Sequence, residues 1–246
     1  NFTTATNSYN VAVGYDAGVA VTTGIKNTFV GGLAGDASTT ASENVAVGYD
    51  SLGTNILGSH SVAVGPSALR TQNYGTATNA YNTAVGSFAG YAVSTGTLNT
   101  YIGGKAGSTS NTAGNNVAVG YDSLALNTKG SKNVAVGESA LYTFNVTTAT
   151  DTYNTAVGHH AGVSITTGIQ NTLIGGLAGD ALTDADFNVA VGINALTTDT
   201  LGSGSTAIGD NALAAQNLTT ATTTYNVAVG ISAGKTITTG IQNCLI

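Results

Sequence analysis

Asn82-Thr83-Ala84-Val85-Gly86 is one copy of a five-residue phrase that recurs through the whole chain. The phrase opens at residues 10, 27, 44, 61, 82, 99, 116, 133, 154, 171, 188, 205, 226 and 243. The numbers of successive openings rise by 17, 17, 17 and 21, and the series then starts again, so Asn10, Asn82, Asn154 and Asn226 mark the returns of a longer super-repeat. Such a period is typical of an architecture in which each repeat packs mainly on its neighbours.

The phrase itself has the pattern of a short strand. We number the positions of each repeat from the opening residue, which is slot zero. Slot one is Val or Thr except at Cys244, slot three is Val or Ile, and slot four is Gly wherever the chain reaches it. β-branched residues at alternate positions that end in Gly predict a strand with slots one and three on one face.

The rest of each repeat is rich in Thr, Ser and Gly, as in residues 21–25, and shows no 3.6-residue apolar stripe that would favour a helix. It predicts a second short strand and a turn. Each repeat is therefore expected to form one coil of a parallel β-solenoid, with equal slots of successive coils about 4.8 Å apart. We expect one continuous solenoid over residues 1–246, divided into super-repeats 1–72, 73–144 and 145–216 and a partial one at 217–246, as a fragment of a longer fibrous chain.

The opening residue is Asn except at Ser61 and Ser205. Asn in this slot predicts either a ladder in which each amide bonds to the next coil or a turn residue selected for its backbone geometry. Both interpretations are structural, and the sequence leaves both open.

The long step adds four residues before the phrase and creates the segments 73–81, 145–153 and 217–225, each of which ends in Tyr. Insertions in a solenoid become loops on one face. We expect every fourth coil to carry such a loop as a spacer or brace, with a ligand contact as the alternative.

Slots two and five vary together within the super-repeat, and slot eight follows a pattern of its own. Slot eight is Gly in the first two coils and Leu in the last two, whereas slot two is large only in the second coil, where slot five is Gly. The coils concerned hold Phe29 with Gly32, Tyr101 with Gly104, and Leu173 with Gly176. We predict that the large slot-two side chain covers the space that a slot-five side chain would fill.

Composition excludes several classes of function. The net charge is −6, with only six Lys and Arg residues, so the chain lacks the basic surface of a nucleic-acid binder or of a polybasic membrane-surface segment. No apolar run approaches the roughly 20 residues of a membrane span, so no membrane insertion is expected in this segment. Cys244 is the only cysteine, so no disulfide can form within the chain.

No arrangement of residues predicts catalysis, a cofactor or a metal site. His159-His160 is the most suggestive pair, but adjacent residues of a strand point to opposite faces and could not readily hold one ion. Asp16, Asp50 and Asp122 recur at slot six, where a turn favours Asp. Nucleophile elbows, phosphate loops and zinc spacings are lacking in the sequence. We therefore predict a protein that is not an enzyme.

The stretch Ser61-Val62-Ala63-Val64-Gly65-Pro66-Ser67-Ala68 resembles the head repeat of trimeric autotransporter adhesins. The resemblance implies a left-handed parallel β-roll in which three chains pack side by side and the two aliphatic residues of the phrase point into the core. The period of this chain, with its short and long steps, exceeds that family's usual repeat. Phrases such as 154–158 also resemble shaft repeats of bacteriophage tail fibres. The expected fold class is thus all-β, a repetitive parallel β-solenoid (β-roll), left-handed and homotrimeric.

The resemblance implies that slots one and three form the structural core. The residues are Val11, Val13, Val30, Val45, Val47, Val62, Val64, Val85, Ile102, Val117, Val119, Val134, Val136, Val157, Ile174, Val189, Val191, Ile208, Val227 and Val229.

One coil offers few large apolar side chains against the entropy of ordering its backbone, which is rich in Gly. We therefore expect the single chain to be unstable alone and to form a homotrimer that continues end to end. The candidate interchain contacts are Leu52, Leu69, Leu124, Leu141, Leu196, Leu213, Phe29, Tyr101 and Leu173.

The first functional hypothesis is a structural, non-enzymatic shaft of an extracellular fibre, of phage tail-fibre or filament type. The alternative is a bacterial adhesin head that binds host matrix or glycan, with further contacts to cell-surface glycan or protein through parts outside this segment. A minor alternative is an ice-binding solenoid, but the Thr22-Thr23 and Thr39-Thr40 array is interrupted one coil later by Ile56-Leu57.

Overall fold

The structure is a computed structural model that describes residues 7–246, over which the chain forms short strands and no helix. The chain divides into two compact units, Asn1–Asn116 and Val117–Ile246, and residues 1–6 of the first super-repeat lie outside the described part. Each unit is a parallel β-solenoid, which confirms the predicted fold class at this level. One continuous solenoid over residues 1–246 stays a prediction.

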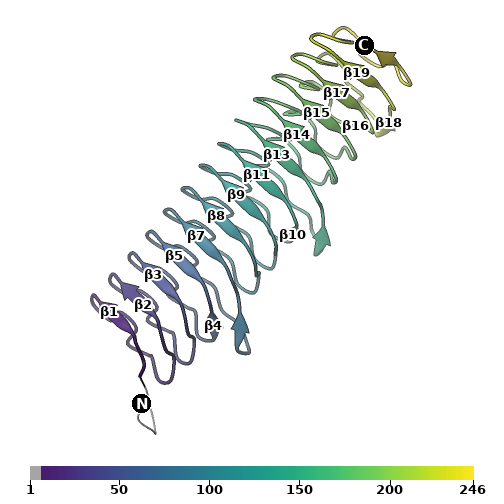
Figure 1. The fold of residues 1–246 in the computed structure, drawn as a ribbon. Helices are drawn as coiled ribbons and strands as arrows, with labels where there is room; N and C mark the ends of the chain where they lie inside the picture. The colour runs from purple at the N-terminus through teal and green to yellow at the C-terminus, as the bar shows by residue number, and fades with distance from the viewer. Residues whose placement is uncertain (1–6) are drawn as a thin grey trace. The chain divides into compact units, whose positions relative to one another are not determined.

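Residues 7–116 of the first unit contain one parallel sheet of six strands (Figure 1). The strands in sheet order are β1 (Val11–Val13), β2 (Thr28–Val30), β3 (Val45–Val47), β5 (Val62–Val64), β7 (Thr83–Val85) and β8 (Thr100–Ile102). A small second sheet pairs β4 (Gly58–Ser59) with β6 (Thr78–Asn79). Val13 pairs with Val30, Val30 with Val47, and Val47 with Val64, so the predicted in-register column is confirmed.

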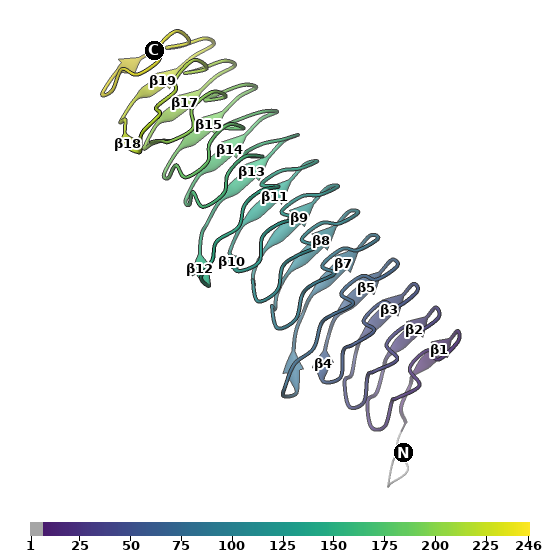
Figure 2. The ribbon, with the colours of Figure 1, turned by 180° about the vertical axis from the view of Figure 1, so that it is seen from behind.

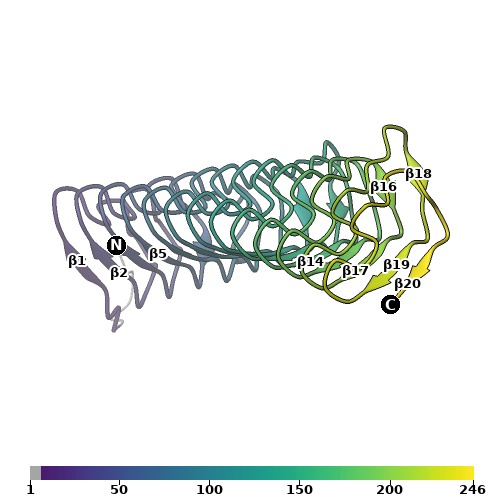
Figure 3. The same cartoon turned by 90° about the horizontal axis from the view of Figure 1, so that it is seen from above.

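Residues 117–246 of the second unit repeat this arrangement with eight strands. They are β9 (Val117–Val119), β11 (Val134–Val136), β13 (Thr155–Val157), β14 (Thr172–Ile174), β15 (Val189–Val191), β17 (Thr206–Ile208), β19 (Val227–Val229) and β20 (Cys244–Leu245). Two small sheets pair β10 (Gly130–Ser131) with β12 (Thr150–Asp151), seen from behind in Figure 2, and β16 (Gly202–Ser203) with β18 (Thr222–Thr223). Figure 3 shows β16 and β18 on a different side of the coils from β17 and β19.

The strand side chains that point into the coil are the alternate set to the one predicted. In β3, Ala46 at slot two is fully buried, while Val45 and Val47 at slots one and three are only half-buried. Successive strand residues point to opposite faces, so only one set can enter the coil. The interior already holds the buried side chains of slots zero, seven and eight, as with Asn44 and Leu52, and the space left at slot two usually fits alanine.

The core prediction for slots one and three is therefore wrong within the single chain, because these side chains lie on the outer face of each sheet. They are half-buried or exposed at Val11, Val13, Val30, Val45, Val47, Val62, Val64, Val85, Ile102, Val117, Val119, Val134, Val136, Val157, Ile174, Val189, Val191, Ile208, Val227 and Val229.

The predicted interchain contacts are also wrong, for the complementary reason. These side chains fill the coil interior and are almost completely inaccessible, which leaves no surface for another chain. The residues are Leu52, Leu69, Leu124, Leu141, Leu196, Leu213, Phe29, Tyr101 and Leu173.

The large slot-two side chain does occupy space that another slot of the coil would otherwise fill. That slot is slot eight rather than the predicted slot five. A Cβ on Gly107 at slot eight would stand 2.5 Å from the Tyr101 ring, whereas a Cβ on Gly176 at slot five would meet nothing within 4 Å. Phe29 lies in the same way against slot-eight Gly35. Coils that have Leu at slot eight keep Ala at slot two. The first coil of each super-repeat has Ala at slot two and Gly at slot eight, and there the large side chain of the next coil fills the space, since a Cβ on Gly18 would stand 2.7 Å from the Phe29 ring.

The corners of the coil require left-handed backbone at residues other than glycine. The residue before the phrase, slot six and slot eight all have positive φ, as in Lys26 (58°), Asp50 (57°) and Leu52 (51°). This conformation costs an L-residue roughly 1–2 kcal/mol. It persists because the parallel ladder on each side of the corner fixes the path of the chain.

The insertions lie on the surface, as predicted. In segment 73–81, residues 75–77 are exposed at the tip, and β6 returns to pair with β4. Tyr81 at the end of the segment is exposed, whereas Tyr74 near its start is 6% exposed and braces the loop against the coil.

Candidate functional site

A ladder of buried amides runs along each unit at slot zero. Asn27 donates its backbone N–H to Asn10 Oδ1 at 2.8 Å, and Asn44 donates its backbone N–H to Asn27 Oδ1 at 3.0 Å. The Asn27 Nδ2 group donates to the Ala41 carbonyl at 2.9 Å, which ties the phrase to the segment that leads into the next phrase. The amide-ladder interpretation is confirmed, and the ladder explains why a buried polar side chain is tolerated in every coil.

The two Ser residues at slot zero are compensated by a buried glutamine. Gln72 accepts a hydrogen bond from Asn82 Nδ2 at 2.9 Å and donates to Ser61 Oγ at 3.0 Å, and Gln216 makes the same contacts with Asn226 and Ser205. The equivalent coil of the middle super-repeat opens with Asn133 instead of Ser. There the position of the glutamine holds the buried Phe144. This exchange was readable in the sequence as a correlation between slot zero and slot eleven, and our sequence analysis missed it.

Tyr74 completes the amide network in the first unit. Its hydroxyl donates to the Gly96 carbonyl at 2.7 Å and accepts from Asn82 Nδ2 at 3.2 Å. Burial raises the pKa of the Tyr74 phenol from 10.0 to about 12, against a smaller lowering by the Asn82 hydrogen bond.

The raised pKa predicts a loss of stability in alkali. Below pH 10 the phenol is neutral in both the folded and the unfolded chain. Between pH 10 and about 12 the unfolded chain ionises while the folded chain resists, so the free energy of unfolding falls as pH rises through this window. Urea unfolding at several alkaline pH values should show a flatter decline for Tyr74→Phe than for wild type. The exposed Tyr81→Phe variant should keep the wild-type slope, and equal slopes in all three proteins would contradict the assignment.

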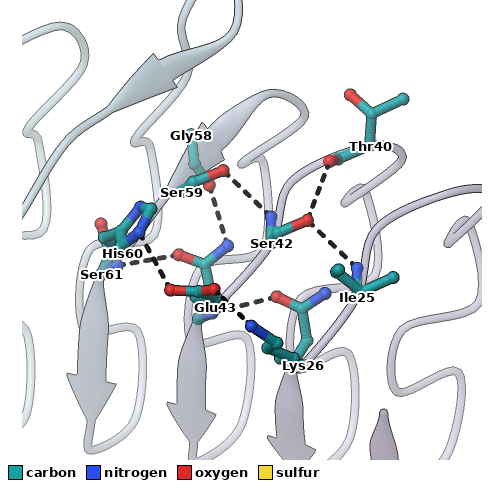
Figure 4. Close-up of polar contacts among 11 residues, drawn as sticks. Ile25, Lys26, Thr40, Ser42, Glu43, Gly58, Ser59, His60 and Ser61 are labelled. Carbon is teal, nitrogen blue, oxygen red and sulfur yellow. Dashed lines mark hydrogen bonds and ion pairs between the residues drawn. The ribbon is translucent and has the colours of Figure 1, made fainter. Parts of the chain in front are cut away.

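Charged side chains form a shorter ladder on the surface of the first unit (Figure 4). Lys26, Glu43 and His60 occupy the slot before the phrase in three successive coils. Glu43 accepts from Lys26 Nζ at 3.0 Å through Oε1 and from His60 Nε2 at 3.0 Å through Oε2. The Lys26 hydrogen bond and charge lower the pKa of the Glu43 carboxyl. Exposed pairs of this kind stabilise a protein only weakly.

A column of hydroxyls runs beside the charged ladder. Ser42 Oγ accepts the Ile25 N–H at 3.1 Å, and Ser59 Oγ accepts the Ser42 N–H at 3.0 Å (Figure 4). In the second unit Asp186 takes the place of Ser42 and accepts the Ile169 N–H at 2.7 Å. These side chains serve backbone groups, and their contacts account for the Ser-rich returns as structural elements.

The structure brings together the two histidines that the sequence analysis placed on opposite faces. The rings of His159 and His160 are stacked with centroids 3.9 Å apart, and Glu138 from the preceding coil lies beside them. The strand β13 ends at Val157, and Gly158 and His160 have φ of 142° and 56°. The pair therefore lies in a turn, where alternation of side chains no longer applies.

The coil surfaces of residues 7–246 include two shallow hollows. One of about 390 Å³ in the first unit is lined by Phe88, Tyr91, Ala92, Lys105, Ser108 and Thr109. The other, of about 310 Å³ in the second unit, is lined by Asp186, Phe187, Ser203, Gly204, Thr223 and Tyr225. In the second hollow, Ser203 Oγ accepts the backbone N–H of Asp186 at 3.0 Å, so this hydroxyl serves the backbone.

Comparison with known proteins finds no matching family model, no matching curated protein and no matching solved structure. Within residues 7–246 there is no helix of the length and apolarity required to cross a membrane. The relation to adhesin heads or tail-fibre shafts therefore depends on the repeated phrase alone.

Proposed function

We propose that this chain is part of the shaft of a non-enzymatic extracellular fibre, of the phage tail-fibre or filament type. The main support for the proposal is that the interior and the outer face of each coil hold different kinds of side chain. Alanine, leucine and aromatic side chains and amide ladders fill the interior, while the β-branched residues of slots one and three form rows along the outer sheet face. Such a chain extends by adding coils and leaves one apolar face for lateral contact.

The lateral contact is the basis for a homotrimer, with left-handed winding of each chain as the resemblance implies. Val227 and Val229 in β19 are each 38% exposed, and the equivalent residues of the other strands are also partly open. Soluble monomers rarely expose long rows of apolar side chains. Three chains that pack these outer faces together would bury the rows, and this arrangement replaces the leucine seam that the structure overturns.

The trimer is testable by mass. Sedimentation equilibrium of the whole chain is expected to give three times the single-chain mass. Changing both Val134 and Val136 of β11 to Lys should shift the equilibrium strongly toward single chains, because it places like charges in the middle of the proposed contact.

A matched control places the same two charges elsewhere on the second unit. Thr148 and Ala149 are exposed at an insertion tip, and changing both to Lys should leave the trimer intact. Circular dichroism and thermal stability should be unchanged in the control, whereas the Val134 and Val136 variant should unfold at a lower temperature, because the single chain is expected to be less stable alone. A wild-type chain that is folded and thermally stable at single-chain mass would contradict the trimer.

The hollow beside Phe88 and Tyr91 favours the adhesin as the second candidate. An exposed Phe88 ring and a half-buried Tyr91 ring with hydroxyl groups at the margin suit a sugar ring, and Arg70 donates to the Tyr91 hydroxyl at 3.1 Å and so orients that ring. A glycan panel probed with wild type and Phe88→Ser, which copies Ser232 of the equivalent coil, should show binding only for wild type. The absence of any wild-type binding would remove this candidate.

A further inference from the structure

Glu138, His159 and His160 are brought together by the register of two coils. The parallel pairing of β11 with β13 places Val136 opposite Val157, so Glu138 and His159 occupy slot five of adjacent coils. The backbone N–H of His160 donates to the Glu138 carbonyl at 3.0 Å, which fixes the position of the turn. The three side chains therefore project from a backbone that is held on both sides.

The donor atoms are close enough to share one ion. One nitrogen from each histidine and one carboxylate oxygen of Glu138 all lie within 4.8 Å of one another, and His159 Nε2 is 3.8 Å from Glu138 Oε2. The next coil has Gly176 at slot five, where an added Cβ would meet nothing within 4 Å. The space on that side of the His159 ring is consequently open.

We propose that Glu138, His159 and His160 bind one divalent transition-metal ion, with Cu²⁺ bound most tightly. Two imidazoles and one carboxylate form a borderline nitrogen and oxygen donor set that suits Cu²⁺, Ni²⁺ and Zn²⁺, and Cu²⁺ leads the stability order of these ions. Hard ions such as Mg²⁺ prefer oxygen donors alone and should not compete. The ion would link two adjacent coils of the second unit.

Binding requires the stacked rings to open. The ring planes are within 13° of parallel, and a metal bond of roughly 2.0–2.1 Å must lie in the plane of each imidazole. Rotation of the exposed His159 side chain toward Glu138 provides this change without moving the backbone. Cu²⁺ binding should therefore abolish the ring stacking.

The experiment is a titration of the full chain with Cu²⁺ alone, followed by calorimetry and by electron paramagnetic resonance. We expect one ion per chain and nitrogen hyperfine structure from the two imidazoles. His159→Ser copies Ser87, and His160→Ser copies Ser232, so both use residues that equivalent coils already contain. Each variant, and Glu138→Gln, should weaken binding by at least about tenfold, the lower end of what disturbing an outer ligand contact costs.

The third histidine of the chain supplies the matched control. His60→Gln retains the cluster and should bind Cu²⁺ with wild-type affinity. Circular dichroism without metal should be the same for all variants. Undiminished Cu²⁺ affinity in His159→Ser, or loss of binding in His60→Gln, would overturn the proposal, as would displacement of Cu²⁺ by excess Mg²⁺.

Discussion

Replacing Gly175 with alanine is expected to lower the free energy of unfolding by at least about 3 kcal/mol. Gly175 ends the phrase at slot four with φ of 136°, a region that L side chains rarely adopt and that costs about 1–3 kcal/mol. An added Cβ would also stand 2.4 Å from the carbonyl oxygen of Gly192 in the next coil. That neighbour is backbone and cannot rotate away, so the coils must separate locally. Urea unfolding gives the global loss, and faster hydrogen exchange of the Gly192 amide, which donates to Ile174 O at 2.8 Å, locates it.

The adjacent glycine is the control. Gly176 lacks a positive φ, and a Cβ there would meet nothing within 4 Å. Gly176→Ala should be neutral or stabilise the chain by up to about 1 kcal/mol, because alanine has less freedom in the unfolded state. Equal destabilisation by the two substitutions would show that the steric account of slot four is wrong.

The second large effect is expected from Gly107→Leu, at roughly 2–5 kcal/mol. The Cβ of the new side chain would stand 2.5 Å from the buried Tyr101 ring, and overpacking of this kind costs about 1–3 kcal/mol. Leu at φ of 57° adds about 1–2 kcal/mol relative to glycine. Chemical denaturation monitored by circular dichroism measures the sum.

A second substitution separates packing from backbone strain. Tyr101→Ala alone should destabilise the chain by about 3–5 kcal/mol, because it empties the coil interior. Combining it with Gly107→Leu recreates the pairing of Ala118 with Leu124, both fully buried, and should recover most of the packing loss. If the double variant is as unstable as the sum of the single variants, slots two and eight do not share one space. The rescue therefore tests the volume exchange directly.

The repeat period was enough to predict the fold class, because a solenoid coil returns each slot to the same place. Val13, Val30, Val47 and Val64 lie in register for this reason. The surface position of the insertions also followed from the repeat, because extra residues in a coil of fixed length must form a loop outside it. The amide ladder was one of two interpretations of slot zero. The glutamines that compensate Ser61 and Ser205 were also within reach of the sequence, as correlated changes eleven residues apart.

The direction of the side chains was not available from the sequence. Alternation separates Ala46 from Val45 and Val47, but it does not say which set enters the coil, and the resemblance to adhesin heads pointed to the wrong one. The left-handed corners at slot eight, as at Leu52, carry no composition signal, since leucine is not among the residue types enriched in that backbone, whereas the Asp at slot six is. These corners aim slot eight inward, which is why the leucines are core.

The sequence by itself determined the period, the parallel register and the column of glycines at slot four, because each follows from identical residues recurring at fixed spacing. Only the tertiary structure decided which face of each strand is buried, which slots exchange volume, and that Glu138, His159 and His160 meet. Those outcomes depend on how the turns bend between strands. Turn geometry is set by the hydrogen bonds to the coils on either side, and a single repeat considered alone does not contain them.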